Sequence, residues 1–73
     1  MEFEIRGNIH ETYEKLEEYL GPPLYQKHSR WGGADWELVA FWVDEVRTWK
    51  RTPMTRVRVT DDSQATYILL KMM

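Results

Sequence analysis

The residue types that most often bind metals are few in this sequence and lie far apart. His10 and His28 are its two histidines, and the chain of 73 residues contains no cysteine. A tetrahedral metal site needs about three or four converging ligands, and no carboxylate cluster with suitable spacing accompanies either histidine. We therefore expect neither a metal site nor any other cofactor.

Residues that could form a nucleophile or an acid–base pair are equally poorly placed. Ser29 and Ser63 lie in segments with the composition of turns, without the strand and helix that flank a nucleophile elbow. Glu17 and Glu18 are neighbours in an expected helix, where adjacent side chains point about 100° apart. Gly32-Gly33 lacks the Lys-Ser/Thr pair of a phosphate-binding loop. The sequence therefore favours a protein without enzymatic activity.

The unusual feature is the aromatic content. Ten residues are aromatic, and four of these are tryptophan. A small chain without disulfides can use large side chains to bury enough area, about 150–250 Å² each, and we expect this role for Trp36, Val39, Val43 and Val46. Trp42 and Trp49 could instead remain available to a partner, because tryptophan is over-represented among interface hot spots. The sequence leaves both interpretations of these two residues open.

Charge is distributed unevenly along the chain. The formal net charge is −2, but residues 1–45 hold ten acids and four bases, whereas residues 46–73 hold six bases and two acids. Five bases form a stretch without an acid: Arg47, Lys50, Arg51, Arg56 and Arg58. With Trp49 as a stacking side chain, this stretch is an alternative nucleic-acid-binding surface. The small net charge argues against a chain dedicated to that role.

The length is that of one small domain, which we place over residues 1–73. The first residues, Met1–Glu4, lack the basic and apolar regions of a signal peptide. No apolar run approaches the roughly 20 residues of a membrane-spanning helix. We therefore expect a cytoplasmic protein without a membrane partner.

The first part of the chain has clear secondary-structure signals. Alternation of apolar and charged residues over 1–6 predicts a half-buried strand. Asn8, with Glu11 three residues later, predicts the start of a helix. Gly21-Pro22-Pro23 then ends that helix, because glycine suits the left-handed terminal position and proline cannot continue it. Residues 22–34 have the composition of a loop.

The next segment, residues 35–49, is ambiguous. Its aromatic and β-branched residues suit a strand over 36–43, but nearly every position there is apolar. Helical spacing collects the apolar residues on one broad arc, places all four acids away from it, and gives Asp35 the N-cap position. The sequence favours the helix.

Two further strands complete the expected fold. Val57 and Val59 alternate with charged residues, and residues 65–72 suggest a strand buried on both faces, after a turn at residues 61–64. The prediction is a small two-layer α+β domain with two helices on a three-stranded sheet, in the order β-α-α-β-β. If the first two strands pair, Glu2 and Glu4 face Arg56 and Arg58.

The expected second helix has a face that could bind a partner. Its outward side carries three acids, Glu37, Asp44 and Glu45, around an exposed Phe41. An aromatic residue surrounded by acids suits docking on a basic protein surface, such as the substrate groove of a nuclease. The apolar edge with Trp42 and Trp49 could instead join two copies of the chain as a homodimer.

An aromatic-glycine loop, Trp31-Gly32-Gly33, leads into the start of the expected second helix, Asp35-Trp36-Glu37-Leu38. This motif is similar to that of the barstar family of small ribonuclease inhibitors, and the resemblance covers residues 2–50. The resemblance implies an intracellular inhibitor in which Glu37 takes the place of the first inhibitory aspartate. The second inhibitory aspartate corresponds to Phe41, which departs from the family pattern.

The leading hypothesis from the sequence is a non-enzymatic protein-binding module. It would be a small inhibitor or accessory factor that docks on a larger basic protein such as a nuclease. Inhibition of a host defence nuclease by a phage or mobile-element protein is an alternative with the same features. Nucleic-acid binding through Arg47–Arg58 is the alternative from a different class.

Overall fold

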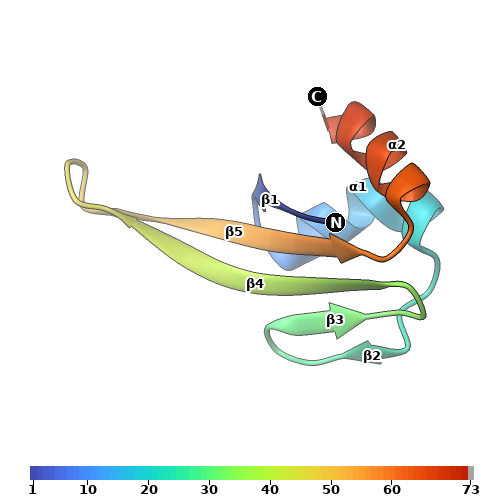
Figure 1. The fold of residues 1–73 in the computed structure, drawn as a ribbon. Coiled ribbons are helices and arrows are strands. Elements are labelled where there is room, and N and C mark those ends of the chain that lie inside the picture. Colours follow the sequence, from blue (N-terminus) through green and yellow to red (C-terminus); the bar gives the residue numbers. More distant parts are fainter. Residues whose placement is uncertain (73) are drawn as a thin grey trace.

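The computed structural model describes residues 1–72, which form one antiparallel sheet with two helices on one side (Figure 1). In chain order the elements are β1 (Glu2–Arg6), α1 (Ile9–Leu20), β2 (Tyr25–Gln26), β3 (Arg30–Gly32), β4 (Trp36–Glu45), β5 (Lys50–Val59) and α2 (Asp62–Met72). The strands lie in the order β1-β5-β4-β3-β2. This five-stranded arrangement contradicts the predicted three-stranded sheet and its β-α-α-β-β order, and only the coarser description as a small α+β domain stands.

The first strand and helix were predicted correctly. The Asn8 side chain accepts a hydrogen bond from the Glu11 backbone N–H at 2.8 Å and so caps α1. Gly21, with a φ of 76°, ends the helix, and its N–H donates to the Glu17 carbonyl. Both signals are local, because each needs only residues within one helical turn.

The predicted helix over residues 35–49 is wrong, because Trp36–Glu45 forms the strand β4. At its start β4 lies between β3 and β5, with Trp36 and Leu38 buried against the helices and Val39 half-buried on the opposite face. The face of β4 that no helix covers also carries apolar residues, at Val39, Phe41 and Val43, so the segment lacks the apolar–polar alternation by which a half-buried strand is recognised. The same dense apolar run fills a helical arc equally well.

The predicted strand over residues 65–72 is also wrong, because this segment belongs to α2. Asp61 accepts a hydrogen bond from the Gln64 N–H at 3.1 Å, so the residues expected to form a turn instead begin a helix. Ala65 and Ile68 are buried at helical spacing, whereas Tyr67 and Leu70 are exposed.

The expected loop over residues 22–34 contains the two short strands β2 and β3. Trp31 is buried there, with its ring edge-on to those of His10 and Tyr13. The ring of Tyr25 lies where a side chain on Gly32 would begin, and the ring of Trp36 occupies the same position over Gly33. Two glycines therefore let two aromatic rings lie directly on the backbone.

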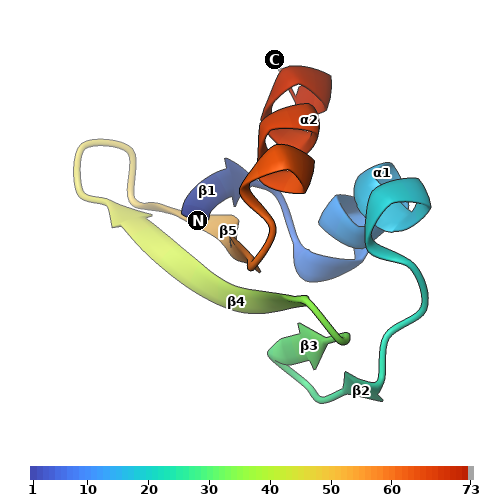
Figure 2. The ribbon, with the colours of Figure 1, turned by 45° about the vertical axis from the view of Figure 1, so that its right-hand side comes forward.

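The core lies between the sheet and both helices, which cover the same face (Figure 2). Its buried apolar residues are Ile9, Leu16, Leu20, Trp31, Trp36, Leu38, Val57, Val59, Ala65 and Ile68. On the uncovered face, Glu2 pairs with Arg58 at 3.4 Å and Glu4 pairs with Arg56 at 3.3 Å. The predicted cross-strand charge pairing is therefore confirmed.

The burial pattern of α2 gives a test of the helix. Ile68→Ala should lower the free energy of unfolding by about 2–5 kcal/mol, because it removes fully buried methylene groups. The control Leu70→Ala should change it by no more than about 0.5 kcal/mol. Urea denaturation of both variants measures the difference. Equal large losses are the result expected of a strand buried on both faces, and they would contradict the helix.

Candidate functional site

The sheet extends on one side into a two-stranded arm. β1 pairs with β5 only as far as Met54, and β3 pairs with β4 only as far as Val39. From Phe41 to Pro53, β4 and β5 therefore pair only with each other, and we call residues 41–53 the arm. Figure 1 shows it projecting beyond the rest of the sheet, along a molecule whose longest dimension is 37 Å.

The end of the arm is a short turn held by one carboxylate. The Glu45 side chain accepts hydrogen bonds from the Thr48 and Thr52 hydroxyls, each at 3.2 Å, and lies 3.9 Å from the Arg6 guanidinium. The turn ends at Trp49, which has a φ of 56°, a conformation uncommon for a bulky residue. We call Val46–Lys50 the tip.

The four tryptophans divide into two pairs. Trp31 and Trp36 are 7% and 6% exposed and belong to the core, with Tyr13 stacked on Trp36. Trp42 on the arm is 56% exposed, and Trp49 at the tip is 89% exposed. Of the two interpretations left open for Trp42 and Trp49, the structure supports exposure.

Two valines expected in the core also lie on the arm. Val43 is 42% exposed and Val46 is 75% exposed, so their predicted burial is wrong. The cause is the hairpin, which carries this part of the apolar segment past the region that the helices cover. The arm and its tip together present an apolar surface without a partner in residues 1–72.

Charged side chains partly cover the aromatic residues of the arm. The Arg51 guanidinium lies 5.2 Å from the centre of the Trp42 ring and 3.3 Å from the Asp44 carboxylate. On the other face, the Arg56 guanidinium lies 5.3 Å from the Phe41 ring. Such cation–π contacts contribute roughly 0.5–1 kcal/mol at exposed sites, so they help to orient both aromatic side chains.

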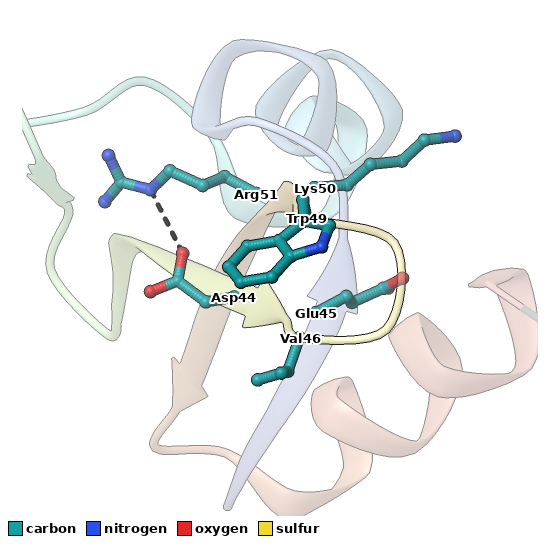
Figure 3. A pocket seen from close by; sticks show the side chains of 6 residues that line it. All are labelled: Asp44, Glu45, Val46, Trp49, Lys50 and Arg51. Carbon is teal, nitrogen blue, oxygen red and sulfur yellow. Dashed lines mark ion pairs between the residues drawn. The ribbon is translucent and has the colours of Figure 1, made fainter.

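The tip contains a hollow of about 230 Å³. It is lined by Asp44, Glu45, Val46, Trp49, Lys50 and Arg51. Figure 3 shows the Trp49 indole in the middle of this group, with the Asp44–Arg51 ion pair on one side and Val46 below. This is a shallow surface hollow rather than an enclosed chamber.

The predicted acidic surface is not formed. Alternation along β4 places Glu37, Phe41 and Glu45 on the uncovered face and Asp44 on the opposite one. The carboxylates are also engaged within the chain, since Asp44 pairs with Arg51, Glu45 with Arg6, and Glu37 with Arg30 at 3.9 Å. These acids therefore do not form the single free acidic surface from which a partner with a basic surface was predicted.

Most of the predicted basic stretch is likewise engaged in ion pairs within the chain. Arg56 and Arg58 pair with the carboxylates of β1, and Arg51 pairs with Asp44. Within residues 1–72, no carboxylate lies within ion-pair distance of Arg47 or Lys50. The free cations of the arm thus lie at its tip, beside Trp49.

A second hollow, of about 370 Å³, lies at the base of the arm and was not predicted. Its walls include Ile9, His10, His28, Ser29, Trp42 and Pro53. The two histidines, distant in sequence, thus line one hollow, which only the tertiary fold could reveal. No group of three or more metal-ligating side chains occurs in the part of the chain that the structure describes.

One phenol has a perturbed titration. The Tyr25 hydroxyl donates a hydrogen bond to the Glu37 carboxylate at 2.7 Å, and this bond raises the pKa of Tyr25. Desolvation and the negative charge of Glu37 raise that pKa further, while Arg30 opposes them. The pair joins the edge strand β2 to β4 across β3.

Comparisons of the chain with protein-family models, with curated proteins and with solved structures gave no match. The segment that carries the barstar resemblance, Asp35–Leu38, enters a strand here rather than the second helix that the resemblance implied. Neither α1 nor α2, the helices of the described residues, has the length and apolar character needed to cross a bilayer.

The Tyr25 contact makes a prediction about pH. The stability that this bond contributes is complete below the unfolded-state pKa of about 10, and is lost as the pH rises through the raised folded-state value. Glu37→Gln should lower the pKa of Tyr25, because it removes the charged acceptor. Absorbance titration shows this once the curve of the matching Tyr25→Phe variant is subtracted. An unchanged Tyr25 curve in Glu37→Gln would contradict the assignment.

Proposed function

We propose that this chain is a non-enzymatic protein-binding module and that the tip of its arm is the contact surface. The observation that carries the proposal is the position of Trp49, which is the most exposed of the large apolar side chains in residues 1–71. It lies at the far end of an arm that projects from the folded body. Isolated apolar residues on a surface are ordinary, but Trp49 and Val46 lie together around one hollow.

The arm supports this proposal because it holds the tip in place. Cross-strand pairing runs continuously from the buried part of the sheet to Glu45↔Lys50. The Glu45 side chain then fixes the turn through two hydroxyl groups. A contact surface that is ordered before binding loses less conformational entropy when the partner arrives.

The unpaired charges indicate the chemistry of the partner. Arg47 and Lys50 flank Trp49 in the sequence and have no acidic partner in the described residues. An apolar pocket with acidic residues around it would complement this tip, because opposite charges at the rim steer association. The sequence predicted a partner with a basic surface instead, because it placed the acidic residues together on one helix face. That helix face is absent from the structure.

An inhibitor or accessory factor of a larger protein is the narrower form of the proposal. Inhibition of a nuclease, including a host nuclease inhibited by a phage or mobile-element protein, fits this form where the tip binds an acidic surface of the nuclease and not its basic substrate groove. The second candidate is nucleic-acid binding, which Arg47 and Lys50 beside an exposed indole favour. Against it, the ion pairs of Arg51, Arg56 and Arg58 occupy three of the five bases that it invoked.

Removing the indole tests the tip directly. In affinity capture from native lysate, Trp49→Ala should lose proteins that the unaltered chain retains, and affinity for an identified partner should fall by at least about 2 kcal/mol. The thermal midpoint should remain close to that of the unaltered chain, because the side chain is 89% exposed. Tyr67→Ala, which removes another exposed aromatic residue from α2, is the matched control and should retain the partner.

Two outcomes would contradict this function. Identical captured proteins for Trp49→Ala and the unaltered chain would exclude the tip as the contact surface. Binding of DNA or RNA oligonucleotides that weakens steeply with salt, and weakens further in Arg47→Glu, would favour the nucleic-acid candidate instead.

A further inference from the structure

On the β4 edge of the arm, the outward-pointing peptide groups face no other strand. The Ala40 N–H donates to the Ser29 carbonyl at 2.8 Å, and the Trp36 carbonyl accepts from the Gly33 N–H at 3.0 Å. Peptide groups of alternate residues in an antiparallel strand point to the same side. Those of Trp42 and Asp44 therefore point to the same edge as Ala40, beyond the point at which β3 ends.

The two edges of the arm differ in how they are protected. On the β5 edge, the Pro53 carbonyl accepts a hydrogen bond from Gly7 at 2.9 Å, and the next residue that points outward is Arg51. Proline and charged residues discourage strand addition. On the β4 edge the residues that point outward are Trp42, which is apolar and exposed, and Asp44, and the exposed Val43 lies between them. A two-stranded ribbon is marginally stable by itself, and a third strand stabilises it.

We propose that a second copy of this chain covers the β4 edge, so that the two β4 strands pair antiparallel about a twofold axis at Val43. In this register Trp42 of each copy lies opposite Asp44 of the other. Each such pair exchanges two backbone hydrogen bonds, so the seam gains roughly four. Every free peptide group of Trp42 and Asp44 is then satisfied.

Charge and available peptide groups select this register over its neighbours. A twofold axis at Asp44 would place two carboxylates directly opposite each other, which is destabilising. An axis at Trp42 would need the peptide group of Ala40, which Ser29 already occupies. With the axis at Val43, the two Val43 side chains meet, Glu45 lies opposite Phe41, and no like charges face each other.

The result would be a continuous four-stranded ribbon, β5-β4 of one copy followed by β4-β5 of the other. The two Trp42 side chains are then diagonal neighbours, about 7–8 Å apart and within reach of each other. Trp49 and Lys50 lie on the β5 side of each hairpin, away from the seam. The dimer therefore leaves both tips open, and its existence does not rest on the function proposed for them.

A cysteine on the twofold axis tests the register. The chain has no cysteine, so Val43→Cys introduces a single thiol. Directly opposed residues of this kind have Cα atoms about 4.5 Å apart, within the range of about 4.4–6.8 Å that a disulfide accepts. In a glutathione buffer, Val43→Cys should form at least about ten times more covalent dimer than the control Thr48→Cys, whose two thiols would lie at opposite ends of the ribbon. Equal amounts would overturn the proposal.

Sedimentation of the unaltered chain tests the dimer without a cross-link. Its mass should be twice the 8.9 kDa of the chain, and dilution should return the monomer. Val43→Lys places two ammonium groups on the axis and should give a monomer with an unchanged circular dichroism spectrum, whereas Thr48→Lys should still dimerise. A monomeric unaltered chain at millimolar concentration would overturn the proposal, as would a dimer that Val43→Lys leaves intact. Neither result would affect capture of a foreign partner through Trp49.

Discussion

The structure depends on a mismatch in strand length. β4 and β5 each have ten residues, whereas the strands beside them, β3 and β1, have three and five. Because the long strands pair along their whole length, one part of their hairpin lies between β3 and β1 and the other part projects beyond them. The part between β3 and β1 holds the core, and the projecting part is the arm. Core and candidate site are thus two ends of one hairpin.

The small size of the domain explains how the part around the core is built. Two helices cover only one face of the sheet, so the aromatic rings of Trp31 and Trp36 fill the space between α1 and the short strands. The opposite face has no helix over it. Charge pairs between β1 and β5 occupy it instead, and each contributes little alone because both partners are exposed. Stability therefore rests on the helical side of the sheet.

Sequence reasoning succeeded where the signal was local or where charges had to pair. The caps at Asn8 and Gly21 define α1, and the Glu–Arg alternation of two strands indicated their pairing across the sheet. It failed for β4, because apolar residues on its uncovered face remove the period by which a strand is distinguished from a helix. The sequence left Trp42 and Trp49 open between the core and a partner surface, and their exposure became clear only from the fold. Their relation to Asp44 and Glu45 could not be predicted either, because it depends on strand alternation and on the hairpin.

The left-handed backbone at Trp49 has a consequence for how stability and binding are balanced in this chain. Glycine or asparagine suits such a position in a hairpin turn, and a bulky residue there costs of order 1–3 kcal/mol. The whole domain, by its size, has only a modest margin of stability. A chain optimised for folding alone would not place its most exposed indole at this position. The indole at position 49 thus costs local stability, which is the cost that the contact role proposed for this residue would explain.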